Sequence, residues 1–97
     1  MPAYVVLTQL TDQGVRAVKD TVKRAQAARE KVEAAGGRVI GIWWLLGKYD
    51  SVLILEVPDQ ETLMRVLLAA GMEGNVRTQT LQAFSEAEMA EILQGMA

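Results

Sequence analysis

The sequence predicts an α+β domain in which a four-stranded antiparallel sheet carries its main helices on one face. Strand-like and helix-like segments follow one another in the order strand, helix, strand, strand, helix, strand, helix. Two apolar runs, "RVIGIWWLL" and "SVLILEV", are separated only by "GKYD", which is typical of an antiparallel hairpin. The 97 residues are 51% hydrophobic and 23% charged, a composition too apolar for a disordered chain and a length suited to one core. We therefore treat residues 1–97 as a single domain.

The first strand and the first helix occupy the N-terminal third of the chain. Residues 3–10, "AYVVLTQL", are rich in β-branched side chains and stop at "TDQG", a cluster of turn and cap residues. Asp12 is a candidate N-cap, and Gly36 and Gly37 lie where a helix C-terminus prefers glycine. One long amphipathic helix is predicted between them. Its apolar face, at spacings of three and four residues, comprises Val15, Val18, Val22, Ala25, Ala28 and Val32.

The second half of the chain repeats the alternation of strands and helices. Gly47 allows the hairpin loop a positive φ, and Pro58 ends the second strand of the hairpin. Asp59 can cap a helix that precedes the strand "VRTQTLQAF". The segment "SEAE", from Ser85 to Glu88, is a capping box that predicts a short last helix. This order is the ferredoxin-like βαββαβ(α) arrangement, whose right-handed crossovers place the first and third strands centrally.

Whether one face of the sheet can be exposed to water depends on the polarity of the side chains on the two faces of the predicted hairpin. We expect Leu46 to pair with Ser51 across the loop. Alternation then directs one set of residues to the helices: Ile40, Ile42, Trp44, Leu46, Leu53, Leu55 and Val57. The opposite face carries Val39, Gly41, Trp43, Leu45, Val52, Ile54 and Glu56. Because large apolar patches are uncommon on soluble monomers, we predict a homodimer or higher homo-oligomer that packs sheet against sheet.

Two features of this hairpin suggest a site. One tryptophan of the pair should fill the monomer's core while Trp43 fills the interface or a pocket within it; the alternative is that both only pack. In the expected register Glu56 lies opposite Gly41. Burial there would raise the pKa of this carboxyl unless a cation paired with it, and Arg38 or Arg77 could supply that cation. Alternatively, Glu56 lies in water at the strand end.

Several function classes are disfavoured by composition. The chain has no cysteine and no histidine, which removes thiolate nucleophiles, disulfides, thiolate or imidazole metal sites and histidine acid/base chemistry. We expect no metal and no cofactor. Ten basic against twelve acidic residues give a net charge of -2, without the basic excess of nucleic-acid-binding proteins. The N-terminal "MPAYVVLTQL" fits neither a signal peptide nor a membrane segment, so a cytoplasmic protein without a membrane partner is expected.

The loop and its surroundings resemble the GYD domain family, named for a glycine-tyrosine-aspartate signature. Here the signature is "GKYD", with Gly47, Tyr49 and Asp50. The resemblance continues through "LTQLTDQGV", "EAAGGRV" and "GNVRTQTLQAFSEAEMAEIL", and so covers nearly the whole chain. It implies a ferredoxin-like domain of the dimeric α/β-barrel type, with no catalytic residues to carry over. The segment "LLGKYDSVLILEVPD" is also similar to the ligand-binding domain of leucine-responsive regulators, where the corresponding loop lies in an effector site between subunits.

Three functions remain open at this point. The first is a non-catalytic oligomeric module that binds a small molecule at or near a subunit interface, with Tyr49 and Asp50 as polar contacts and Trp43 as an apolar wall. The second is a small cofactor-independent enzyme of the dimeric α/β-barrel type, with Glu56 or Asp50 as base and Arg77 steadying an oxyanion. The third is a purely structural or regulatory self-assembly module. For "GKYD" the plainer interpretation is a well-formed turn.

Overall fold

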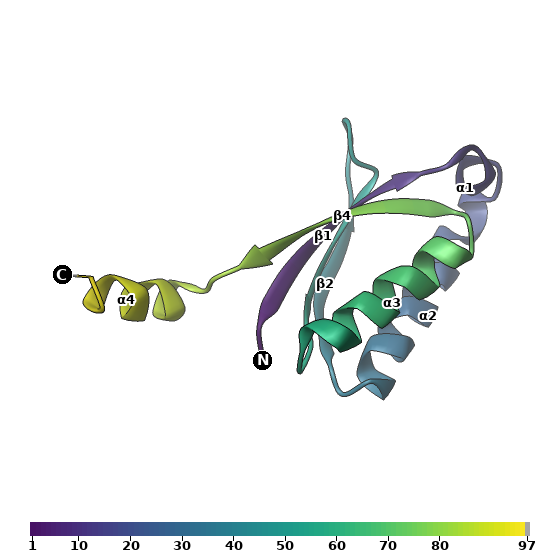
Figure 1. The fold of residues 1–97 in the computed structure, drawn as a ribbon. Coiled ribbons are helices and arrows are strands. Elements are labelled where there is room, and N and C mark those ends of the chain that lie inside the picture. Colours follow the sequence, from purple (N-terminus) through teal and green to yellow (C-terminus); the bar gives the residue numbers. More distant parts are fainter. Residues whose placement is uncertain (97) are drawn as a thin grey trace.

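The computed structural model, which describes residues 1–96, confirms the ferredoxin-like α+β fold. Its elements are β1 (Ala3–Leu10), α1 (Asp12–Arg16), the 3₁₀ turn η1 (Val18–Asp20), α2 (Thr21–Ala34), β2 (Arg38–Trp44), β3 (Ser51–Glu56), α3 (Gln60–Met72), β4 (Val76–Ala83) and α4 (Glu86–Gln94). The four strands pair antiparallel in the order β2-β3-β1-β4, so the first and third strands are central, as predicted. Helices α2 and α3 lie side by side on one face of this sheet (Figure 1).

The core lies between the sheet and these two helices. Alternate residues of the central strands point toward the helices, which is why Tyr4 and Val6 of β1 are buried with Leu55 of β3. Val32 of α2 and Leu63 of α3 close the core from the other side. The buried side chains of the strands therefore point to one face of the sheet, the face that carries α2 and α3.

A longer loop and a β-bulge in β2 together change the register that we expected for the hairpin. Trp44, not Leu46, pairs with Ser51, because the loop spans residues 45–50 and Leu46 is fully exposed. The bulge lies between Val39 and Gly41, and the extra residue exchanges the two faces of the strand before it. Val39 consequently joins the core at 8% exposure, whereas Ile40, which we had directed toward the helices, is 50% exposed.

The single long helix predicted from residue 12 is wrong, because the chain is interrupted between α1 and α2. Thr11, not Asp12, is the N-cap of α1: its side chain accepts a hydrogen bond from the N–H of Gly14 at 3.1 Å and donates one to the carbonyl of Gly74. Gly14 lies against the backbone of Asn75. These contacts hold α1 at the start of β4 and turn the chain before α2 begins. The apolar residues of this part are exposed, namely Val15, Val18 and Val22.

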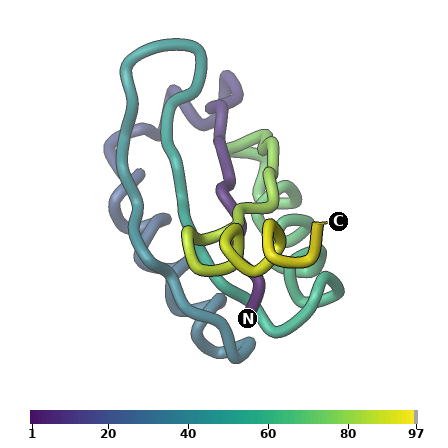
Figure 2. Tube along the Cα trace, turned by 90° about the vertical axis from the view of Figure 1, so that its left-hand side faces the viewer, coloured from purple at the N-terminus to yellow at the C-terminus, as the bar shows by residue number. Residues whose placement is uncertain are grey.

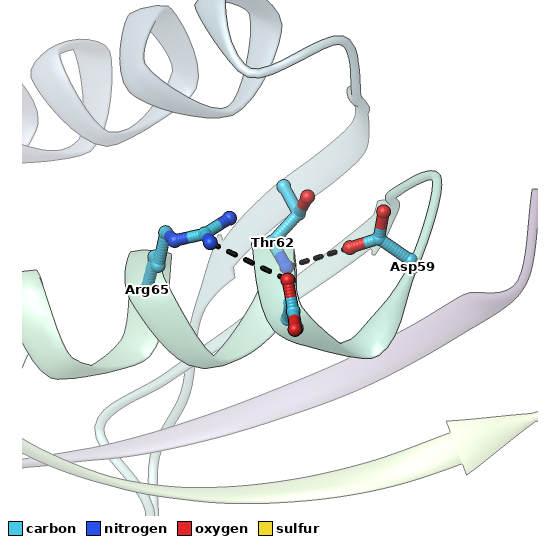
Figure 3. A network of polar contacts seen from close by, with 4 residues as sticks. Asp59, Thr62 and Arg65 are labelled. Carbon is cyan, nitrogen blue, oxygen red and sulfur yellow. Dashed lines mark hydrogen bonds and ion pairs between the residues drawn. The ribbon is translucent and has the colours of Figure 1, made fainter.

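The N-caps predicted for the later helices are confirmed. The Asp59 carboxylate accepts a hydrogen bond from the N–H of Thr62 at 2.8 Å, and Arg65 pairs with Glu61 one turn further on, at 3.4 Å (Figure 3). Helix α4 begins with a complete capping box. In it the side chain of Ser85 accepts from the N–H of the residue three positions on, whose carboxylate accepts in return. Both helices thus begin where local sequence rules place them.

The two capping carboxylates make stability depend on pH. Hydrogen bonds from the backbone N–H of Thr62 and of Ser85 lower the pKa of Asp59 and of Glu88 below their ordinary values of 3.8 and 4.5. A carboxyl whose pKa is lower in the folded state stabilises the protein above its unfolded pKa, and this contribution is lost as pH falls through the folded pKa. We therefore expect the urea midpoint to fall in acid below those ordinary values.

Replacing both groups, Asp59→Asn with Glu88→Gln, removes these titrations and should flatten that acid decline. The matched control is Glu61→Gln, which removes an exposed carboxylate that caps no helix. Urea denaturation followed by circular dichroism between neutral pH and about pH 3 checks this. If the urea midpoint fell with pH equally in the wild type and in the double variant, the two capping carboxylates would not be the cause of the decline.

The C-terminal part extends away from the domain. Strand β4 pairs with β1 along its whole length, and α4, which follows it, stands clear of the other elements (Figure 1). The principal extents are 52 × 30 × 18 Å, and the radius of gyration is 14.7 Å. A compact chain of this length has a radius of gyration of about 12.5 Å. The β2–β3 loop projects at one end of the sheet (Figure 2).

Candidate functional site

The face of the sheet that carries no helix is apolar, as predicted. The strand registers place Val5 opposite both Ile54 and Leu81, and Leu7 opposite Val52, which in turn pairs with Trp43. We call these side chains the helix-free face: Val5, Leu7, Trp43, Val52, Ile54 and Leu81. Trp43 is 52% exposed and Leu81 is 47% exposed. No described helix covers them (Figure 1).

Trp43 lies flat along its own strand. A Cβ added to Gly41 would lie 2.3 Å from the Cη2 atom of the Trp43 ring, so the indole covers the glycine. Any other residue at position 41 would push the ring away from the sheet. The pair Gly41 and Trp43 therefore forms a broad aromatic surface on the helix-free face.

Polar groups mark the two ends of this face. At the loop end, the hydroxyl of Tyr49 donates to the side-chain carbonyl of Gln79, and the Gln9 amide donates to the Lys48 carbonyl at 3.0 Å. These bonds hold the "GKYD" loop against β1 and β4. Its Gly47 has a φ of 129°, which confirms the predicted positive φ.

Glu56 lies at the other end of the helix-free face and is paired. Our expectation that it faces Gly41 is wrong: the bulge places Arg38 opposite Glu56, and their side chains meet at 2.7 Å. Of the two cations considered from sequence, Arg38 is the one that binds the carboxylate. The guanidinium of Arg77 instead donates to the carbonyl of Val76 at 2.9 Å.

A cavity of about 150 Å³ lies on the other side of the sheet, between the strands and helices α2 and α3; we call it the helix-side cavity. Its floor and walls include Ile42, Leu53, Leu55, Val66 and Leu67. Trp44 lies at its rim at 48% exposure, and the indole N–H donates to the hydroxyl of Thr21 at 3.1 Å. The prediction that one tryptophan fills the monomer's core is therefore wrong.

Polar side chains line one part of the helix-side cavity. Asp50 accepts a hydrogen bond from the N–H of Leu10 at 2.7 Å through its Oδ2 atom. Arg24 of α2 donates through Nη1 to the carbonyl of Ala17 at 2.9 Å, whereas its Nη2 atom is buried without a partner in the described structure. Neither side chain takes part in an ion pair within residues 1–96.

The five site residues proposed from sequence do not lie together: they are divided between the helix-side cavity and the opposite side of the sheet. Asp50 lines the helix-side cavity. Trp43, Glu56 and Arg77 belong to strand positions on the opposite side of the sheet, and Tyr49 lies in the loop beside them.

Sequence reasoning missed Arg24. The short side chains of "AQAA", which follow it directly, were the available signal, because they leave room between helix and sheet.

Within residues 1–96, no cluster of three or more aspartate or glutamate side chains is placed to hold a metal ion. None of the described helices is both long enough and apolar enough to cross a bilayer.

Known proteins provide a comparison for the whole chain. The model of the GYD domain matches residues 4–93. A relative from Thermus thermophilus, the "Glutamine synthetase and cystathionine beta-lyase binding protein", is 33% identical over 90 residues, which cover 92% of this chain and 95% of the relative.

Two solved structures resemble the fold. TTHA0845, also from Thermus thermophilus, superimposes with a TM-score of 0.55 at 28% identity, over 88% of this chain and 95% of that one. MtbAldR superimposes with a TM-score of 0.64 at 15% identity, over 88% of this chain and 52% of that one, which is a likeness of fold alone. Because the family model and the Thermus relative both span most of its length, the chain belongs to the GYD domain family.

Proposed function

We propose that the protein is a non-catalytic binding module that works as a homodimer joined through its helix-free face. The uncovered apolar side chains of that face carry the proposal. The accessible surface of the chain is 6689 Å². A compact monomer of this mass exposes about 5,500 Å², so roughly 1,200 Å² is in excess. A stable dimer of ordinary size buries about 800 Å² on each partner, which this excess can supply.

Helix α4 supports the same assembly. Its Met89, Ile92 and Leu93 lie on one side of the helix at spacings of three and four residues, and all of them are exposed. An isolated helix of 9 residues is marginal in water, so a surface that covers this side would stabilise it. A second copy offers such a surface, because α4 stands clear of its own domain (Figure 1).

A second copy also suits the polarity of the face. Its centre is aliphatic and aromatic, and the charged pair of Arg38 and Glu56 is already neutralised at one end. A centre without charged groups offers nothing for a charged partner to pair with. Two identical apolar faces, in contrast, are complementary in a symmetric dimer. The dimer would leave the helices and the loop tips free for other contacts.

The name of the Thermus relative supports a protein partner for those free surfaces. That protein is named as binding glutamine synthetase and cystathionine β-lyase, and it aligns with this chain over 95% of its length. We extend the proposal to this class: the dimer binds an enzyme rather than transforming a substrate. The prediction of a small molecule beside Trp43 and Tyr49 stays a prediction.

Native mass spectrometry tests both parts of the proposal. The purified chain should give twice its mass of 10.6 kDa. Mixing it with purified glutamine synthetase, or with cystathionine β-lyase, from the same source should give a further complex. A monomer at every accessible concentration would overturn the dimer, whereas a dimer that joins neither enzyme would remove the proposed partners alone.

A further inference from the structure

We propose that the helix-side cavity binds a small aliphatic carboxylic acid, with its hydrocarbon tail among the core side chains and its carboxylate on Arg24. The cavity lies on the opposite side of the sheet from the helix-free face. The proposal therefore does not depend on the dimer, and either can fail without the other.

The volume and lining of the cavity set the size and character of the tail. An apolar protein cavity of about 150 Å³ is large enough to hold benzene, and this one has the same volume. The space exists because Ala25 and Ala28 of α2 and Ala70 of α3 have short side chains where the helices meet the sheet. Leu53 and Val66 are among the aliphatic side chains that face it. A branched hydrocarbon of a few carbons fits this environment.

Arg24 supplies the reason for an acid. Its guanidinium is anchored by the bond from Nη1 to the carbonyl of Ala17 at 2.9 Å, and its side chain lines the cavity. Nη2 is buried and has no acceptor among the described residues. A buried donor without an acceptor is costly, and a carboxylate is the acceptor that a guanidinium binds best. A ligand carboxylate would satisfy this donor.

The other charges at the cavity are already engaged. Lys31 and Glu73 form an ion pair at 3.0 Å, and Asp50 accepts from the N–H of Leu10. Thr8 and Ser51 bond to each other through their hydroxyls. Asp50 nevertheless carries a negative charge, which disfavours an anionic ligand. The Asp50→Asn variant should therefore bind the acid several-fold more tightly than the wild type does.

Isothermal titration calorimetry with three probes tests the ligand class. Isocaproate carries both the tail and the carboxylate, isoamylamine carries the tail with a cation, and acetate carries the carboxylate without the tail. We expect isocaproate to bind about 10- to 100-fold more tightly than either of the others, because only it uses both parts of the site. Equal binding of isocaproate and isoamylamine, or no binding of isocaproate at millimolar concentration, would overturn the proposal.

Three variants locate the binding. Arg24→Gln should weaken isocaproate about 10- to 100-fold without weakening isoamylamine, because the loss of a positive charge does not disfavour a cation. Ala28→Leu keeps every charge and fills the cavity, so it should abolish isocaproate binding even if Arg24→Gln fails to fold. Arg65→Gln, at an exposed arginine on α3, is the matched control and should bind as wild type does. Unchanged binding in Ala28→Leu would place the ligand elsewhere and refute the site.

Discussion

Replacing Ile54 by lysine is expected to leave the protein monomeric under conditions in which the wild type forms the proposed dimer. Ile54 lies on the helix-free face between Val5 of β1 and Gly41 of β2, and so near the centre of the proposed interface. An ammonium group there would have to lose its water on dimerisation, and Glu56, the carboxylate two residues along the same face, is already paired with Arg38. The effective cost of such an unpaired buried charge is several kcal/mol. A penalty of that size lowers dimer affinity by a factor of about a thousand or more.

Sedimentation equilibrium measures this change, and a matched variant controls for added charge. Met64→Lys introduces the same side chain at an exposed position of α3, away from the helix-free face. It should remain a dimer. Both variants should keep the circular dichroism spectrum of the wild type, because neither replaces a buried residue. If Ile54→Lys were as dimeric as Met64→Lys, the interface would have to lie on another surface.

Gly14→Ala is expected to destabilise the fold strongly although it adds only one methyl group. A Cβ at Gly14 would lie 2.1 Å from the carbonyl oxygen of Asn75, which is backbone and cannot turn aside. The backbone of α1 or the start of β4 must then shift, and overpacking of this kind costs about 1–3 kcal/mol. The free energy of unfolding from urea denaturation should fall by that amount.

Gly71→Ala is the internal comparison for this experiment. Gly71 lies in the last turn of α3, and a Cβ there would meet nothing within 4 Å. Alanine favours a helix over glycine, so this variant should gain about 0.5–1 kcal/mol. Opposite signs for the two substitutions would separate the tertiary contact at Gly14 from the general effect of glycine. A stabilised Gly14→Ala would show that α1 does not pack on Asn75 as described.

Local rules predicted the elements whose boundaries depend on neighbouring residues. Asp59 and Ser85 begin helices because their side chains reach N–H groups only three positions away. Gly47 takes the positive φ that the hairpin loop needs. The order of the segments was enough for the sheet topology, since crossover handedness leaves few alternatives. The apolar second face followed from the same strands.

The failures share a different cause, which is contact between residues far apart in the chain. The break after α1 depends on Thr11 meeting Gly74 and on Gly14 meeting Asn75, which are contacts with a distant part of the chain. The bulge at Ile40 likewise depends on how β2 meets β3. Because one extra residue exchanges the faces of a strand, the bulge moved Val39 into the core. Together with the loop of residues 45–50, it also placed Arg38 opposite Glu56.

The sequence by itself determined the fold class, the N-caps of α3 and α4, the apolar second face and the resemblance to the GYD domain, since each depends on short-range spacing or on motif order. Only the tertiary structure decided the hairpin register, the ion pair of Glu56 and the helix-side cavity with Arg24 at its edge. A cavity is the space left between elements after they pack. Its position therefore depends on the distance between helix and sheet, a quantity that no local pattern contains.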